Sequence, residues 1–565
     1  MFQFKAPKHF LLLPFFLIAG CGQGLNEPKA PAKTQNQLAV DELFKDWDVA
    51  GSAGASVAVI QEGELLYSSA YGEAQVEYGV AIDPTTVFHV ASVTKQFTAF
   101  GIALLADQDL LSLEDDIRTY IPEVPDFGTK ITIRQLANHT SGLRDQWNLL
   151  ALGGWRVDDV ITLGHVMKMV TRQNALNFPP NEEYNYSNTG FTLLAEIVAR
   201  VGGKPFPIWM EENVFLPLGM DHTLIYDDHE KIVNNRAYSY HTDETGLKKS
   251  ILSYAITGAT SLFTTAEDLT LWMNNFSTHV LGSDEVHNNF RTQGVLNNGE
   301  TIDYAMGIVA SEYRGLKVLG HGGADAGFRS NVIYFPGQKF GVAVLSNLAS
   351  FNPGGLAEQI ADIYLTDQLT PREEPKEETP IETVDVAEDI LETYVGLYGF
   401  VEMEGLTMEV ELEDGALSSV DPNGVIHNFK AIAQNRFTSD KNNTKFEFRE
   451  NEEGVIDMVI DFGREFMAKR IKKLNLTDTQ LKVYVGDYYS TELETSYRII
   501  VRDGALVAVH SRHQDIGLKA LEADKFGGTE WFFGETRFER NEEGSITAMF
   551  VSSGRVKDLK FIKSQ

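Results

Sequence analysis

A serine and a lysine three positions apart form the first group of residues that could do chemistry. Ser92 and Lys95 follow a strand-like stretch at 87–90 and open a strongly apolar helix. Residues three apart share one helix face, so the hydroxyl and the amine are expected to be neighbours. A lysine within an apolar helix loses hydration, which lowers its pKa and lets it activate a nucleophile. Taken alone, a helix-capping serine followed by a lysine that reaches solvent explains the pattern better.

Tyr186 and Asn188 form the second group, in a turn-rich loop at 179–190 that precedes another apolar helix. A phenol whose pKa is lowered by nearby cations can accept the serine proton and return it to a leaving group. An asparagine amide can bridge a lysine and a substrate carbonyl. A surface turn with a packing tyrosine is the simpler explanation of this loop by itself.

His321, Gly322 and Gly323 form the third group, just before a predicted hairpin. Glycines beside a strand let a substrate backbone approach closely, and an edge strand can direct an N–H at a developing oxyanion. A single histidine is more often a structural residue.

Other catalytic patterns are missing from the sequence. It contains no G-x-S-x-G, H-E-x-x-H or C-x-x-C motif, no glycine-rich phosphate loop and no His/Asp/Glu cluster with metal spacing. We therefore expect neither a metal nor another cofactor.

Strand-like and helix-like patterns alternate between about residues 41 and 367, and these elements must position the three groups. Alternating apolar residues around a glycine turn predict one hairpin near the start of this region and another near its end. Strands at both ends with helices between them predict one mixed α/β (α+β) domain, whose sheet joins its first and last segments. The predicted hairpin strands are 56–60, 65–67, 332–335 and 342–345, and the predicted helices are 93–106, 190–201 and 355–365.

The composition changes after this domain. Residues 368–388 are rich in proline and acidic side chains, which predicts a linker. The tyrosine-containing segment 391–398 then recurs 90 residues later at 481–488. Each copy has short alternating strands separated by glycine turns, as in an antiparallel barrel or sandwich. We predict two tandem antiparallel β-barrel domains, 389–474 and 478–565.

The single cysteine, Cys21, follows a pattern typical of an export signal. Lys5 and Lys8 precede an apolar run at 10–18 that is too short to span a bilayer as a helix. Ile18-Ala19-Gly20-Cys21 resembles a lipobox, although an ordinary signal peptide with an incidental cysteine is an alternative. We expect a lipoprotein signal at 1–20, a lipid anchor on Cys21, and a flexible tether over 21–40. The protein would then be exported, periplasmic or at the cell surface.

Charge and composition exclude one class of partner and one class of structure. The formal net charge of -32 argues against nucleic acid, because a polyanion would be repelled. A hydrophobic content of 43% is ordinary for a globular protein and excludes disorder over most of the length. Membrane contact is expected only through the lipid anchor, and the oligomeric state stays open.

The three motifs, in this order and with His139-Thr140-Ser141-Gly142-Leu143 between the first two, resemble those of the penicillin-recognising serine hydrolases. This family includes class C β-lactamases, D-alanyl-D-alanine carboxypeptidases, D-aminopeptidases and related esterases. The resemblance covers about residues 41–367 and implies a β-lactamase/transpeptidase-like catalytic domain. His321 stands where the family usually has lysine, which is similar to the D-aminopeptidase and esterase branches. The two predicted barrels, lipocalin-like in type, resemble those of D-aminopeptidase.

The resemblance assigns a catalytic role to each motif. It implies that Ser92 is the nucleophile of an acyl-enzyme and that Lys95 and Tyr186 share the proton transfers, with the identity of the base left open. It also implies that Asn188 orients the substrate. His321 would hold Tyr186 or bind substrate.

The same resemblance suggests where the substrate carbonyl is held. Gly323 would line the substrate-binding strand, and the backbone N–H groups of Ser92 and Ala324 would form the oxyanion hole. The expected substrate is a small peptide or ester.

Three functions follow from these residues. The first is a D-stereospecific peptidase or aminopeptidase that acts on short peptides. The second is an esterase or weak β-lactamase that uses the same serine. Because neutral histidine stabilises a substrate carboxylate less well than lysine, we expect poor penicillin turnover. The third is an inert ligand-binding lipoprotein whose barrels hold the ligand.

Overall fold

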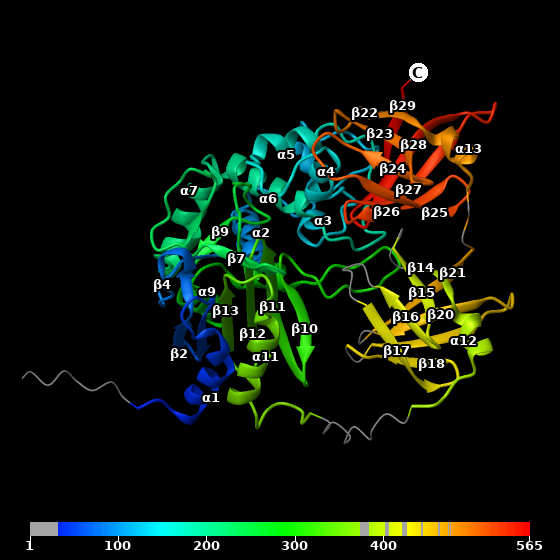
Figure 1. Cartoon of the computed structure of the whole chain (residues 1–565). Coiled ribbons are helices and arrows are strands. Elements are labelled where there is room, and N and C mark those ends of the chain that lie inside the picture. Colours follow the sequence, from blue (N-terminus) through cyan, green and yellow to red (C-terminus); the bar gives the residue numbers. More distant parts are fainter. Residues whose placement is uncertain are drawn as a thin grey trace, which may run out of the picture.

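The computed structural model describes residues 32–372, 383–401, 406–420, 426–441, 444–461, 464–472, 474 and 476–564. It contains an α/β domain followed by two closed β-barrels (Figure 1). Cys21 and the predicted signal lie outside the described residues, as do residues 373–382 of the predicted linker, so those predictions remain expectations. In the described ranges, no helix is long and apolar enough to cross a membrane.

The α/β domain is built on a six-stranded antiparallel sheet. Its first strand pairs with its last, from Ala55 opposite Ser346 to Gln61 opposite Phe340, as predicted. Glu62 and Gly63 form the first hairpin turn with φ angles of 52° and 87°. In spatial order the strands are β10 (Val309–Tyr313), β11 (Leu316–Asp325), β12 (Phe328–Phe335), β13 (Phe340–Ser346), β1 (Ala55–Gln61) and β2 (Glu64–Tyr71).

Helices cover both faces of this sheet (Figure 1). Side chains alternate between the faces, so Val57 and Val59 of β1 pack with the terminal helices α1 and α11, whereas Ala58 and Ile60 face the larger helical layer. The helices are α1 (Gln35–Phe44), α2 (Thr94–Asp107), α3 (Ile133–Ala137), α4 (Gln146–Leu152), α5 (Leu163–Val170), α6 (Asn188–Gly202), α7 (Phe206–Met210), α8 (Leu216–Leu218), α9 (Ala266–Thr278), α10 (Asp284–Arg291) and α11 (Pro353–Tyr364).

Short elements connect the sheet and the helices. The small strands are β3 (Glu73–Gln75), β4 (Val80–Ala81), β5 (Phe88–His89), β6 (Leu224–Ile225), β7 (Ser239–Asp243), β8 (Gly246–Ser250) and β9 (Leu262–Thr264). The short helical turns are η1 (Lys45–Trp47), η2 (Val76–Tyr78), η3 (Ala91–Val93), η4 (Ile117–Thr119) and the π-turn η5 (Glu211–Phe215).

The structure corrects the end of the predicted tether. Residues 21–40 were expected to be flexible, but α1 begins at Gln35 with a capping box at Thr34. Val40 and Phe44, four positions apart on one face of α1, are fully buried, and the Phe44 ring stacks on Tyr71 at 4.8 Å. Burial of this apolar face holds the segment in the helix.

The C-terminal repeat folds as predicted, into two eight-stranded antiparallel barrels whose first and last strands pair. The same hydrogen bond recurs in both copies of the repeated segment: Tyr398 Oη donates to the Tyr394 carbonyl at 2.7 Å, and Tyr488 Oη donates to the Tyr484 carbonyl at 2.6 Å. The first barrel contains α12 (Glu388–Tyr394), β14 (Gly396–Phe400), β15 (Thr407–Glu413), β16 (Ala416–Val420), β17 (Ile426–Ala433), β18 (Arg436–Ser439), β19 (Lys445–Glu450), β20 (Ile456–Asp461) and β21 (Glu465–Ile471). The second contains α13 (Asp478–Leu481), η6 (Lys482–Tyr484), β22 (Gly486–Ser490), β23 (Thr495–Arg502), β24 (Ala505–Val509), β25 (Ile516–Glu522), β26 (Lys525–Glu530), β27 (Phe533–Arg540), β28 (Ile546–Ser553) and β29 (Val556–Lys563).

The second barrel packs against the α/β domain beside α4 (Figure 1). Arg144 Nη1 donates to Glu492 Oε2 at 2.8 Å, and the two side chains are only 2% and 6% exposed. Tyr497 Oη donates to the Leu152 carbonyl at 3.1 Å. A buried ion pair between two domains fixes their relative position, because separating the charges would leave each without its partner.

We expect Glu492→Ala to destabilise the docked protein by about 3 kcal/mol, because Arg144 would stay buried without its counter-charge. The measurement is urea unfolding, followed by hydrogen exchange of α4 and the second barrel. Glu494→Ala is the matched control: Glu494 forms an ion pair with Arg172, and these side chains are 54% and 32% exposed. Loss of this exposed ion pair should change the free energy of unfolding by less than about 1 kcal/mol. Equal effects of the two substitutions would contradict the docking role of Arg144 and Glu492.

Candidate active site

Ser92 lies in the short turn η3, which runs directly into α2. The preceding Ala91 has a φ of 48°, a left-handed conformation that is strained for a residue with a side chain. Gly323 of β11 makes this turn possible, since a Cβ there would lie 2.3 Å from the Val90 carbonyl oxygen. The missing side chain of Gly323 thus admits the turn that carries Ser92. Gly323 also lines the cavity of Ser92, so its predicted contact with substrate remains a prediction. Gly322 is the less crowded glycine, because a Cβ there would meet nothing closer than an Asn331 amide nitrogen at 3.6 Å.

The amine of Lys95 is fully buried and surrounded by three oxygen atoms. Nζ lies 2.9 Å from Asn188 Oδ1, 2.8 Å from the Ala259 carbonyl oxygen and 3.1 Å from Ser92 Oγ. The amide and carbonyl oxygens can only accept, so each requires an N–H from Lys95. The third side of the Lys95 nitrogen faces the Ser92 hydroxyl, which can either accept a hydrogen bond from an N–H or donate one to the nitrogen lone pair. A neutral amine therefore satisfies all three contacts while accepting the serine proton.

Burial also favours this neutral form. Loss of hydration lowers the pKa of Lys95 to about 7, with a smaller contribution from the Arg555 cation, whereas the Asp145 and Asp325 carboxylates act in the opposite direction. The sequence predicted a shift of this direction from the apolar helix alone. Near neutral pH, a substantial fraction of the amine is available as a base.

Asn188 is held from behind by a carboxylate that the sequence reasoning missed. Asp145 Oδ2 accepts from the Asn188 side-chain amide at 2.8 Å and from its backbone N–H at 2.7 Å. Both ends of the Asn188 amide are thus occupied, by Asp145 and Lys95. Asn188 therefore has a positioning role. Because it also lines the cavity of Ser92 and its amide keeps a second N–H, the predicted substrate contact remains a prediction. Asp145 follows the His139–Leu143 motif by two residues, but nothing in that spacing pointed to Asn188.

Tyr186 completes the group around Ser92. The centroid of its ring lies 4.8 Å from Lys95 Nζ, and its hydroxyl lies close enough to Ser92 for the serine hydroxyl to lower the pKa of the phenol in part. Burial raises the pKa of Tyr186 above its usual value. The phenol is therefore protonated at neutral pH, which favours Lys95 over Tyr186 as the base that accepts the serine proton. The three side chains predicted to converge do so.

His321 lies beside Tyr186 but is held by another tyrosine. Its Nε2 accepts from Tyr304 Oη at 2.8 Å, its Nδ1 contacts the Gly322 carbonyl, and its ring centroid is 6.2 Å from that of Tyr186. Burial, reinforced by the nearby Lys95, lowers the pKa of His321 to about 4, so the imidazole is neutral. Two roles were expected for His321, holding Tyr186 and binding substrate. His321 is hydrogen-bonded to Tyr304 instead of Tyr186. Because His321 lines the cavity, substrate binding remains a prediction. Tyr304 carried no sequence signal.

The edge of β11 offers the N–H group predicted for an oxyanion hole. Asp325 pairs with Phe328 around a two-residue loop, and hydrogen-bonded pairs alternate with non-hydrogen-bonded pairs from there. Ala324 therefore occupies a non-hydrogen-bonded position, and its N–H points away from β12. The pairing of β10 with β11 ends at Gly320, which leaves this edge open beside the turn of Ser92. The oxyanion hole itself remains a prediction.

Ser92 opens into a cavity of about 760 Å³ that two domains enclose. The α/β domain contributes Tyr186, Asn188 and His321, and the second barrel contributes Trp531 and Arg555. Sequence reasoning could not say which barrel reaches the site. The buried Arg144–Glu492 contact explains the outcome, because it places the second barrel against this side of the domain.

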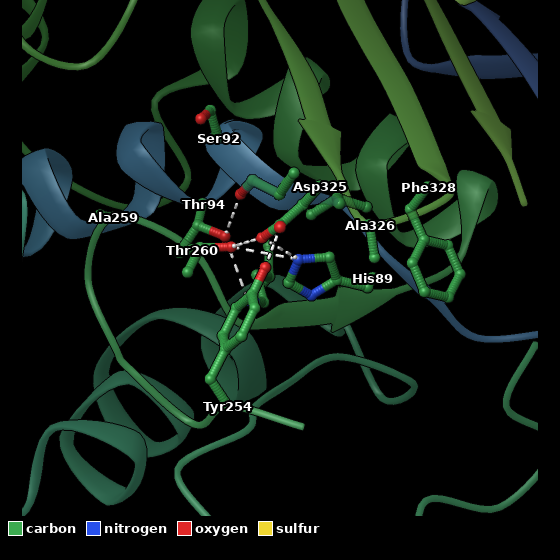
Figure 2. Close-up of polar contacts among 12 residues, drawn as sticks. His89, Ser92, Thr94, Tyr254, Ala259, Thr260, Asp325, Ala326 and Phe328 are labelled. Atoms are coloured by element: carbon green, nitrogen blue, oxygen red, sulfur yellow. Dashed lines mark hydrogen bonds and ion pairs between the residues drawn. The ribbon is translucent and has the colours of Figure 1, made fainter. Parts of the chain in front are cut away.

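Asp325 is the only carboxylate among the described residues that line this cavity. Figure 2 shows His89, Thr260 and Tyr254 pointing toward it, with Ser92 nearby. Asp325 Oδ2 accepts from Thr260 Oγ1 at 2.9 Å and lies 3.0 Å from His89 Nε2, and Oδ1 accepts from Tyr254 Oη. These contacts fix the carboxylate at one end of the site. Across the described part of the chain, no cluster of His, Cys, Asp or Glu could hold a metal ion.

Comparison with known proteins agrees with this geometry. The Beta-lactamase family model matches residues 40–365, more than half of the chain. The chain belongs to the beta-lactamase family. With its fold and its relatives, this makes it a serine hydrolase and confirms the family resemblance of the three motifs.

Relatives of the chain carry different names. A D-aminopeptidase of Gluconobacter oxydans is 26% identical over 294 residues, which cover 52% of this chain and 55% of the relative. A penicillin-binding protein of Bacillus subtilis is 28% identical over 336 residues, covering 56% of this chain and 72% of the relative. The chain thus spans about half the length of the D-aminopeptidase that it matches.

A solved structure supports the fold beyond the catalytic domain. The octameric penicillin-binding protein homologue from Pyrococcus abyssi has a TM-score of 0.55 and 21% identity, and the match covers 77% of this chain and 99% of that chain. This match extends past the length of the α/β domain alone.

The ester-hydrolysis rate should rise with pH through about 7, because Lys95 accepts the serine proton only as the neutral amine. The measurement is the pH profile of kcat/KM for p-nitrophenyl acetate, which has no titrating group of its own. Asp145→Asn should move the inflection to lower pH, because the Asp145 carboxylate favours the charged amine. Ser92→Ala gives the background hydrolysis. A profile that is flat from pH 6 to 8, or that inflects only above pH 9, would contradict the role of Lys95.

Proposed function

We propose that this serine hydrolase is a D-stereospecific peptidase that cleaves short peptides through an acyl-enzyme on Ser92. The observation that carries the proposal is the hydrogen bonding of the Lys95 amine. Two of its hydrogen-bond positions are taken by the Asn188 and Ala259 oxygen acceptors, and the third faces Ser92 Oγ. This arrangement activates a serine without requiring a charged base. The neutral His321 and the second barrel at the site favour the peptidase function, as do relatives named D-aminopeptidase.

Acylation begins when Lys95 accepts the Ser92 proton and Oγ bonds to the substrate carbonyl carbon. The N–H groups of Ser92 and Ala324 stabilise the oxyanion. The bond to the leaving nitrogen then breaks, Tyr186 delivers a proton to that nitrogen, and the Lys95 ammonium restores the proton of Tyr186, which returns the amine to its neutral form. Water attacks the acyl-enzyme in the second half of the reaction, returns a proton to Ser92 and releases the acid.

Esterase or weak β-lactamase activity is the second candidate, because the same acyl chemistry serves esters and strained amides. His321 argues against efficient penicillin turnover, since a neutral imidazole offers a substrate carboxylate no charge. An inert binding protein is disfavoured, because Lys95, Asn188 and Tyr186 hold a geometry around Ser92 that ligand binding by barrels does not require.

The proposal predicts hydrolysis of D-Ala-p-nitroanilide at least about ten-fold faster, in kcat/KM, than of L-Ala-p-nitroanilide, and slow hydrolysis of nitrocefin. Ser92→Ala should abolish all three activities, since removal of a catalytic nucleophile typically lowers the rate by orders of magnitude. Initial rates across these substrates, with p-nitrophenyl acetate as the ester reference, are the measurement.

A fluorophosphonate probe provides the control for inertness. Mass spectrometry should locate a covalent adduct on Ser92 in the unmodified protein and no adduct in Ser92→Ala. Rapid nitrocefin turnover, or equal rates on D- and L-anilides, would reverse the ranking of the candidate functions. Absence of both an adduct and any hydrolysis would support the inert alternative.

A further inference from the structure

Arg555 brings a fixed positive charge from the second barrel to the catalytic cavity. It follows Gly554 in the turn between β28 and β29 and lines the same cavity as Ser92. Its guanidinium carbon lies 5.0 Å from the centroid of the Tyr186 ring. The guanidinium has neither a hydrogen bond nor an ion pair with any residue that the structure describes. Five N–H donors are therefore open to a ligand in the cavity.

The backbone of this turn is firmly held, so Arg555 is a positioned residue rather than a side chain on a free loop. The Arg555 carbonyl accepts from the Asp145 N–H at 3.1 Å and from the Asn177 side-chain amide at 2.9 Å. The Gly554 carbonyl accepts from Asn185 at 2.9 Å. Asp145 also holds Asn188, so one residue ties the barrel turn to the group around Lys95.

The other charged groups of the cavity have partners within the protein. Arg329 donates to the carbonyls of Ala326 and Phe328, at 3.2 and 2.7 Å. Asp325 accepts from Thr260, Tyr254 and His89 as described above. Arg555 is thus the cation that remains for an anionic group of the substrate.

We propose that Arg555 binds the free carboxylate of the substrate's leaving residue. The inference rests on the peptidase function proposed above and names its substrate class: short peptides that end one residue beyond the scissile bond. Arg555 lies over the ring of Tyr186, which protonates the leaving nitrogen, so the guanidinium is on the leaving-group side. Its planar fork matches a carboxylate bidentately.

Binding to the Ser92→Ala protein tests the inference without turnover. D-Ala-D-Ala should bind at least about ten-fold more tightly than D-Ala-D-Ala amide by calorimetry, the range expected for hydrogen bonds to a charged group. Arg555→Gln in the same background should remove this preference, and Arg555→Lys should retain part of it because the charge stays while the fork is lost. Arg537→Gln is the matched control, since Arg537 is a half-exposed arginine of the same barrel paired with Asp558 outside the cavity.

Kinetics provide the second readout. Arg555→Gln should lower kcat/KM for D-Ala-D-Ala at least about ten-fold more than for its amide. The comparison uses this ratio because loss of Arg555 also raises the pKa of Lys95 and changes both rates together.

The outcomes separate the two proposals. Equal binding of acid and amide, or an acid preference that survives Arg555→Gln, would overturn the role of Arg555 and leave the peptidase function standing. Hydrolysis of p-nitrophenyl acetate without hydrolysis of any D-peptide or D-anilide would overturn the peptidase function and, with it, the substrate class proposed here.

Discussion

The buried amine of Lys95 is the constraint on which the rest of the site depends. Burial removes its bulk hydration, and its contacts within the protein are Asn188 Oδ1, the Ala259 carbonyl and Ser92 Oγ. Two of these atoms only accept, which leaves the third direction to the serine hydroxyl. Burial that destabilises the ammonium also creates the base. A charged lysine at the surface would have neither a fixed contact with the serine nor a lone pair to accept its proton.

This constraint extends outward through Asp145, which holds Asn188 with its carboxylate and the barrel turn with its backbone N–H. The second barrel is therefore part of the catalytic cavity rather than an appendage. Its docking through Arg144 and Glu492 brings Arg555 close enough to influence Lys95. In this arrangement, the electrostatics of the nucleophile and the recognition of the substrate depend on the same inter-domain contact. Gly323 also helps to position Ser92, from within the catalytic domain, because its missing side chain lets β11 approach the Ser92 turn.

Local patterns predicted much of this architecture. Glycine turns between apolar strands identified both hairpins, and the repeated tyrosine segment identified the two barrels. Motif order brought Ser92, Lys95 and Tyr186 together correctly. The partners of these residues were harder to predict, because Asp145, Tyr304 and Arg555 act only after segments distant in sequence have packed. A Gly-Arg pair does occur in each copy of the sequence repeat, at Gly463-Arg464 and Gly554-Arg555, but no sequence feature shows which barrel docks at the site. The early start of α1 was missed because its apolar face depends on Tyr71 and other distant residues.

Direct titration of Lys95 tests the central claim most closely. Carbon-13 labelling of lysine Cε, with the Lys95 signal assigned by its loss in Lys95→Met, would report the charge of this one amine in the intact protein. The account predicts a midpoint at about pH 7, well below that of the solvent-exposed lysines. A Lys95 signal that titrates together with the exposed lysines, above pH 10, would show that the amine is charged at neutral pH and would contradict its role as the base.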